Sequence, residues 1–178
     1  LRLKTFASKK LIKYKEMAIS TGGVLMTFEG NPDKVIVKAV GDKPSDYKVT
    51  HKLRSDSVKV WFDAGKENIG VAVSENLKFS YDIGAKQDTV SIFYKKPAKE
   101  DMTVSNPFSN ELAPGSDFRF ASNYIINKIQ PENWKLESDS ISQNFTAKIS
   151  ELDSTQVIVK SNFVVGKKYK LTVPKNTV

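Results

Sequence analysis

Apolar residues occur along this chain in short stretches rich in β-branched and aromatic side chains, most of them bounded by Gly, Pro, Asn, Asp or Ser. This pattern is typical of β-strands. Several stretches also alternate apolar and polar positions, as in Val58-Lys59-Val60, which a half-buried strand requires. The pattern predicts strands at residues 1–6, 11–20, 23–29, 34–40, 47–53, 57–63, 75–83, 88–96, 117–121, 132–138, 143–150, 155–160 and 167–173. Many short antiparallel strands indicate an all-β protein.

Residues 9–18 leave a helix open as an alternative. Leu11, Tyr14 and Ala18 would share one face of a helix. Ile12 and the Thr-Gly-Gly turn at 21–23 fit a strand followed by a turn equally well.

A charged segment that contains proline, KKPAKED at residues 95–101, separates two strand-rich halves. We therefore expect two tandem immunoglobulin-like (Ig-like) antiparallel β-sandwich modules, at 1–97 and 98–178, each near the ~100 residues of such a sandwich. Residues 1–97 carry 18 basic and 11 acidic side chains, whereas residues 98–178 carry 10 and 9. Most of the net charge of +8 thus belongs to the first module, which is basic.

The two halves also share a weak internal pattern, which suggests a repeated unit. The first half contains a Phe-x-x-Asn element at 28–31, then DSVKV at 56–60, then the strand around Lys78. The second half has the same order, at 120–123, 153–159 and 168–171. Residues 1–6 echo residues 90–95, as if the chain opened on the closing strand of a preceding module, and we expect the chain to be a fragment of a longer one.

Composition restricts the chemistry available to the chain. With no cysteine among 178 residues there is no disulfide or thiolate metal site, and with one histidine His-rich metal sites and most catalytic triads are disfavoured. No nucleophile, base and orienting group can be assembled from the residues, so we expect a protein that is not an enzyme and has no catalytic residues, metal or cofactor. His51, between Thr50 and Lys52 on an alternating strand, is expected at a solvent edge or in a cross-strand pair. The acidic residues 42, 46, 56 and 63 fall in turns and do not form a calcium loop.

The second half resembles the bacterial Ig-like modules of surface-layer proteins and of large Bacteroidetes surface lipoproteins. The resemblance is carried by LAPGSDFRF, ENWKLESDS and STQVIVKSNFVVGKKYKLTV, above all by the closing phrase FVVGKKY at 163–169. It covers residues 108–178 well and the first half loosely, and the Asp-x-x-Gly-Asn that usually follows the Tyr strand is missing. These motifs describe strands and contain no catalytic pattern, so the resemblance implies a fold. It also implies a location at the cell surface or in the periplasm, with the full-length protein anchored to the outer membrane.

Candidate ligand-binding residues fall into two groups. Trp61 and Phe62 could form a stacking platform for sugars, and adjacent strand residues point to opposite faces, so one of them should be buried and the other exposed. We expect Trp134, by contrast, in the core on the same face as Leu136, with Lys135 opposite. The second group is basic and would attract an anionic polymer only if its side chains shared one continuous face: Lys34, Lys38, Lys48, Lys52 and Lys59. Spread over two faces, these lysines would protect sheet edges and keep the module soluble.

These observations favour non-catalytic structural or adhesive modules of a bacterial cell-surface or periplasmic protein. The alternative is a carbohydrate-binding module or an accessory domain of a polysaccharide-acting protein, for which an exposed Trp61 or Phe62 would be the distinguishing feature. The expected partner is a cell-surface polysaccharide or protein. Nucleic acid is disfavoured because no RNA-binding aromatic motif or recognition helix accompanies the lysines. No apolar run approaches the ~18–20 residues that span a bilayer, so no transmembrane segment is expected.

Overall fold

The computed structural model describes residues 11–52, 55–84, 86–98, 101–107 and 111–178. The chain divides into two compact units, Leu1–Lys99 and Glu100–Val178. The division lies two residues after the boundary expected from the charged segment. The all-β prediction is confirmed, because the sole helical element of the described residues is a short 3₁₀ turn at Pro131–Asn133. The strand predicted at 1–6 lies outside the described residues.

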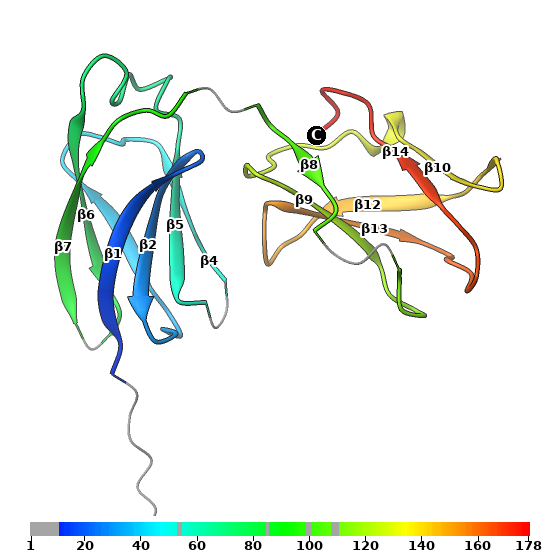
Figure 1. The fold of residues 1–178 in the computed structure, drawn as a ribbon, viewed down its shortest axis with the longest axis horizontal. Helices are drawn as coiled ribbons and strands as arrows, with labels where there is room; N and C mark the ends of the chain where they lie inside the picture. Colours follow the sequence, from blue (N-terminus) through cyan, green and yellow to red (C-terminus); the bar gives the residue numbers. More distant parts are fainter. Residues whose placement is uncertain (1–10, 53–54, 85, 99–100, 108–110) are drawn as a thin grey trace, which may run out of the picture. The chain divides into compact units, whose positions relative to one another are not determined.

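Two antiparallel sheets make up the first unit (Figure 1). Its strands are β1 (Lys13–Ser20), β2 (Gly23–Glu29), β3 (Ile36–Val40), β4 (Tyr47–His51), β5 (Ser57–Phe62), β6 (Glu75–Asp82) and β7 (Gln87–Tyr94). One sheet has the order β1-β2-β5-β4, and the other has the order β3-β6-β7. Each of these strands overlaps a stretch that the apolar pattern predicts.

The segment at 9–18 that left a helix open as an alternative forms strand β1 from Lys13 onward, and Leu11 and Ala18 of the proposed helical face are exposed. Pairing between β1 and β2 shifts register between Tyr14 and Glu16. An extra residue in one strand turns the side chains that follow it to the other face. Tyr14 and Met17 therefore both pack against the core although they are three residues apart.

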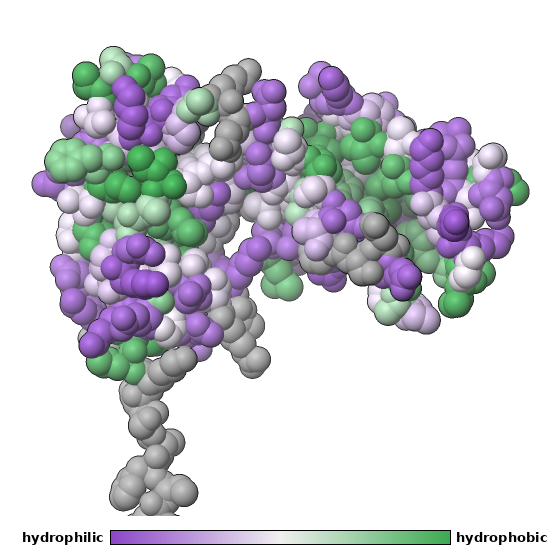
Figure 2. Space-filling view, in the orientation of Figure 1, coloured by the Kyte–Doolittle hydropathy of each residue, from purple (hydrophilic) through white to green (hydrophobic). Residues whose placement is uncertain are grey.

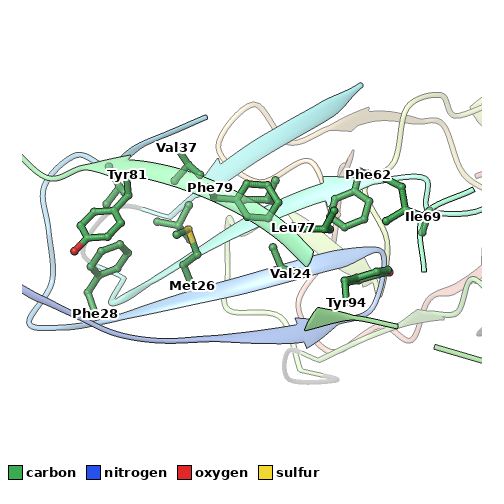
Figure 3. Packing of buried hydrophobic residues seen from close by; sticks show 14 of the residues in the cluster. Val24, Met26, Phe28, Val37, Phe62, Ile69, Leu77, Phe79, Tyr81 and Tyr94 are labelled. Atoms are coloured by element: carbon green, nitrogen blue, oxygen red, sulfur yellow. The ribbon is translucent and has the colours of Figure 1, made fainter. Parts of the chain in front are cut away.

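The core of the first unit lies between its two sheets, and alternate residues of the strands supply most of its side chains. Figure 3 shows Phe28 beside Tyr81 at one end of the cluster, and Phe62, Ile69 and Tyr94 at the other end. The ring centroids of Phe28 and Tyr81 are 5.6 Å apart in an edge-on arrangement. Such pairs stabilise a core by about 0.5–1.5 kcal/mol beyond the burial of their area.

The second unit is also built from two antiparallel sheets. Its strands are β8 (Val104–Ser105), β9 (Phe118–Ser122), β10 (Lys135–Ser138), β11 (Ile141–Ser142), β12 (Phe145–Ile149), β13 (Gln156–Ser161) and β14 (Lys170–Thr172). Their orders are β12-β13-β9-β8 and β11-β10-β14. The sequence pattern does not predict β8 and β11, because two residues are too few to show alternation.

Trp134 lies in the core of the second unit, as predicted. Its ring is 5.7 Å from that of Phe120, and its indole Nε1 donates a 2.8 Å hydrogen bond to Oγ1 of Thr177. Leu136 is buried and Lys135 is exposed, in agreement with the predicted faces. The hydrogen bond satisfies the one polar group of a tryptophan that is buried among apolar side chains.

The four-stranded sheets of the two units have the same connectivity. Read from the edge formed by the first strand, the two sheets have the orders β1-β2-β5-β4 and β8-β9-β13-β12. In chain order, β8, β9, β12 and β13 therefore occupy the places of β1, β2, β4 and β5. Two of the sequence phrases that suggested a repeat fall on strands with the same place in these sheets, at the ends of β2 and β9 and along β5 and β13. The third phrase falls along β6 and β14, which belong to three-stranded sheets of different order.

Candidate functional site

Trp61 is the first candidate for a ligand platform, and the structure places it on the outer face of the β1-β2-β5-β4 sheet. Its side chain alternates with the core residues Val60 and Phe62 along β5. The ammonium of Lys59 lies 3.6 Å from the centroid of the Trp61 ring. The indole Nε1 donates a 2.7 Å hydrogen bond to Oγ1 of Thr50 on β4. The tryptophan is only 6% exposed.

Phe62, the second aromatic candidate, points into the core between the sheets. It is 7% exposed, and its ring centroid is 5.1 Å from that of Tyr94. The expectation that one member of this pair would be buried and the other exposed is wrong. The two side chains do point to opposite faces, but neighbouring side chains cover Trp61 on the outer face, and a long lysine stem can cover apolar surface while its charged end reaches water. The exposed aromatic that would favour a sugar-binding platform is not present at either position.

The five candidate lysines divide between the two sheets of the first unit. Lys59 lies on the outer face of β5, Lys48 is the cross-strand neighbour of Trp61 on β4, and Lys52 directly follows β4. Lys38 is an exposed residue of β3 in the opposite sheet, and Lys34 precedes that strand. The structure therefore does not assemble the single face of five lysines on which attraction of an anionic polymer depends. Figure 2 shows hydrophilic and apolar side chains interspersed over the visible face.

Carboxylates of the first unit are engaged in holding its loops. Both oxygens of Glu67 accept hydrogen bonds from the loop before β4, from the backbone N–H (2.7 Å) and hydroxyl (2.9 Å) of Ser45 and from the N–H of Asp46 (3.2 Å). Slight burial raises the pKa of Glu67, but these hydrogen bonds outweigh it and lower the pKa below its ordinary value of 4.5. Asp63 Oδ1 accepts hydrogen bonds from the N–H groups of Gly65 and Lys66, which caps the turn after β5.

His51 ends strand β4 and is half-buried. Its Nε2 lies 3.1 Å from the carbonyl oxygen of Ser55, and because a carbonyl can only accept, Nε2 carries the proton of this hydrogen bond. Its cross-strand partner is Val58. In the described ranges, no three His, Asp or Glu side chains gather where they could hold a metal ion.

Tyr169 performs a corresponding loop-holding task in the second unit, in the connection from β13 to β14. Its phenolic oxygen accepts a 2.8 Å hydrogen bond from the backbone N–H of Val164 and lies 3.4 Å from the carbonyl oxygen of Asn162. Its ring packs edge-on against Phe163, with centroids 5.0 Å apart. In the first unit the equivalent connection, from β5 to β6, is held by Glu75, whose Oε1 accepts a 3.2 Å hydrogen bond from the N–H of Gly70.

The roles of Tyr169 and Glu67 in organising loops were not predicted from the sequence. For Tyr169 a signal existed, since it closes the FVVGKKY phrase that carries the family resemblance. For Glu67 none existed, because its partners Ser45 and Asp46 are more than twenty residues away.

Comparisons with models of known protein families, with curated proteins and with solved structures found no match. Among the residues that the structure describes, no helix is long and apolar enough to cross a membrane. What this chain does must therefore be argued from its own strand order and contacts.

Proposed function

We propose that both units are Ig-like modules and that the chain is a non-catalytic structural or adhesive part of a bacterial cell-surface or periplasmic protein. The strand order of the first unit is the observation that carries this proposal. Read as strands A to G, its sheets have the orders A-B-E-D and C-F-G. That is the order of a seven-stranded, constant-type Ig sandwich.

The second unit supports the same assignment through its own order. Its larger sheet reads A-B-E-D in the same lettering, and β10 and β14 take the places of strands C and F. Two successive units whose larger sheets share one strand order are what an array of repeated modules would contain.

Tyr169 adds a second, independent feature of this fold. In Ig-like sandwiches a tyrosine near the start of strand F commonly bonds through its hydroxyl to the backbone a few residues upstream. Tyr169 directly precedes β14, the F strand, and its hydroxyl bonds to the backbone at Val164, five residues upstream. The residue also lies in the sequence phrase that resembles the bacterial surface modules.

A structural or adhesive role is supported by what the candidate side chains do. Trp61 and Phe62 are used in packing, and Glu67, Asp63 and Tyr169 hold loops in place. Since Ig-like folds carry many functions, the fold itself decides neither the ligand nor the location. Location rests on the resemblance and needs a direct test.

The test uses antibodies against the whole chain on intact, outer-membrane-permeabilised and fully lysed cells of the source organism. We expect labelling of intact cells, or of cells whose outer membrane alone is opened. Labelling confined to fully lysed cells would contradict a surface or periplasmic location. In parallel, turnover of any cell-envelope glycan or peptide by the purified chain would overturn the non-catalytic assignment.

A further inference from the structure

Phe93 on strand β7 presents an aromatic ring to solvent. It is 75% exposed, and among the described phenylalanines and tryptophans it is the one classed as exposed. It lies between Ile92 and Tyr94, whose side chains pack in the core, so its own side chain is on the outer face of the β3-β6-β7 sheet. The exposed aromatic that is absent at positions 61 and 62 is therefore present in the opposite sheet.

The lysine nearest to Phe93 along the strand is held elsewhere, which leaves the ring open. Lys95 lies two positions after Phe93 and so on the same face. Its ammonium donates a 2.7 Å hydrogen bond to the carbonyl oxygen of Ala72, in the loop before β6. Two positions before Phe93 lies Ser91, whose side chain is too short to cover a ring. The covering by a neighbouring lysine that buries Trp61 does not occur here.

The neighbours of Phe93 on this face are polar. Asn76 lies directly opposite on β6, and Lys78 lies diagonally across, opposite Ser91. All three side chains are exposed, and the amide and the hydroxyl can both donate and accept hydrogen bonds. A sugar ring has an apolar C–H face and a rim of hydroxyls. One open aromatic ring among hydrogen-bonding side chains therefore suits a sugar.

Other classes of partner fit this face less well. The core of a protein–protein interface is an apolar area from which charged residues are depleted, whereas Phe93 is bordered by Asn76, Lys78 and Ser91. A single-stranded nucleic acid binds through several aromatic rings on which successive bases stack. On the outward positions of β3, β6 and β7, Phe93 is the single aromatic residue.

Two lysines give the face a positive charge. Lys78 on β6 and Lys38 on β3 are diagonal neighbours across the sheet, and both are exposed. Within the described ranges, neither ammonium forms an ion pair. The one carboxylate on the outward positions of these strands is that of Asp82, which accepts hydrogen bonds from Gln87 Nε2 (2.6 Å) and the N–H of Gly84 (2.7 Å). The charge of the face therefore complements an acidic ligand.

We propose that the outer face of the β3-β6-β7 sheet binds a carboxylated oligosaccharide, with one sugar ring stacked on Phe93 and carboxylates of neighbouring sugars bound by Lys78 and Lys38. Diagonal neighbours of adjacent strands are about 7–8 Å apart, so the line from Phe93 through Lys78 to Lys38 spans about 15 Å. The ammonium groups would form charge-assisted hydrogen bonds with the carboxylates. This inference gives the proposed adhesive role a partner, but it rests on one sheet face and not on the location or the Ig-like identity.

The first test measures binding of the whole chain to three carboxylated polysaccharides, polygalacturonate, alginate and hyaluronan, by affinity electrophoresis in native gels. Fully methyl-esterified polygalacturonate is the uncharged control. We expect at least one of the three to retain the chain, less strongly as salt rises, and the ester to retain it weakly. No retention by any of the three, or equal retention by the ester, would overturn the proposal. Either result would leave the cell-labelling test of location unaffected, so the two proposals fail separately.

The second test assigns the binding to named side chains. Phe93→Ala should weaken binding about tenfold or more, whereas Phe93→Trp keeps an aromatic platform and should preserve it. Lys78→Gln should weaken binding and reduce its dependence on salt. Lys15→Gln removes the same charge from an exposed position in the opposite sheet and should have a smaller effect. Melting temperatures verify that the variants are folded. Unchanged binding by Phe93→Ala, or equal effects of the two lysine variants, would overturn the proposal.

The third test locates the site by the amide chemical shifts of the isotopically labelled chain during titration with the retained oligosaccharide. We expect changes at Asn76, Lys78 and Ser91. Changes confined to the β1-β2-β5-β4 sheet or to the second unit would contradict the proposed face. A thymidine oligonucleotide is titrated in parallel. Tighter binding of the oligonucleotide, with the same dependence on Phe93, would overturn the assignment to a sugar.

Discussion

The ammonium of Lys59 lies 3.6 Å above the centre of the Trp61 ring, two positions along the same strand. Residues i and i+2 of a strand share a face, so the pair needs no tertiary contact to form. The cation is attracted by the negative face of the indole, and its stem covers apolar surface that would otherwise contact water. A tryptophan that could have bound a sugar ring is thereby occupied by its own neighbour.

Replacing Lys59 should expose Trp61 and lower stability modestly. We expect Lys59→Ala to reduce the free energy of unfolding by about 0.5–1 kcal/mol, the usual strength of an exposed cation–π contact. The fluorescence of Trp61 should move to longer wavelength, measured in a Trp134→Phe background so that one indole is observed. Lys59→Arg keeps the cation and should preserve the spectrum. An unchanged spectrum in the alanine variant would show that Lys59 does not cover the ring.

Removal of the Tyr169 hydroxyl should loosen the connection between β13 and β14. Tyr169→Phe leaves the packing against Phe163 and removes the acceptor for the Val164 N–H. We expect a loss of about 0.5–1.5 kcal/mol in unfolding free energy and faster hydrogen exchange at the Val164 amide. Val165→Ala, at a residue of the same connection that is 77% exposed, is the control and should change neither. Unaltered exchange in Tyr169→Phe would contradict the role of the hydroxyl.

The contact between Glu67 and the loop before β4 should make stability depend on pH. The pKa of Glu67 is lowered in the folded protein, so folding favours the carboxylate. This stabilisation is complete above the unfolded pKa and disappears as the pH falls through the folded value. Melting temperatures of the unaltered chain and of Glu67→Gln should therefore differ at pH 7 and converge in acid, below the ordinary pKa of 4.5. Glu132→Gln, at an exposed residue of the 3₁₀ turn, is the matched control. A difference that persists unchanged into acid would rule out the carboxylate as its origin.

Gly23 should tolerate no side chain. It begins β2 opposite Trp61 with a φ of +151°, and a Cβ there would collide with the backbone carbonyl of Val60. We expect Gly23→Ala to destabilise the first unit by more than the ~1–3 kcal/mol of backbone strain alone, because it adds a clash with β5. Gly41→Ala separates the two effects, since Gly41 also has a positive φ, of +101°, but open space around it. Equal losses in urea unfolding of the two variants would show that the clash is relieved.

Alternation of side chains is a local property, and for that reason the sequence alone determined much of this fold. It placed β2 at residues 23–29 and located β5, β6 and β13 to within a residue or two. It also located the division between the units to within two residues and placed Trp134 in a core. Each of these inferences depends only on which way neighbouring side chains point, which the strand geometry decides without reference to the rest of the chain.

Only the tertiary structure decided which surfaces are free. Trp61 is covered because Lys59 and Thr50 reach it, Lys38 and Lys48 are separated because β3 and β4 belong to different sheets, and the bulge in β1 is visible only in its pairing with β2. Exposure depends on neighbours that are distant in sequence, and a period of two residues contains no information about which strands become those neighbours.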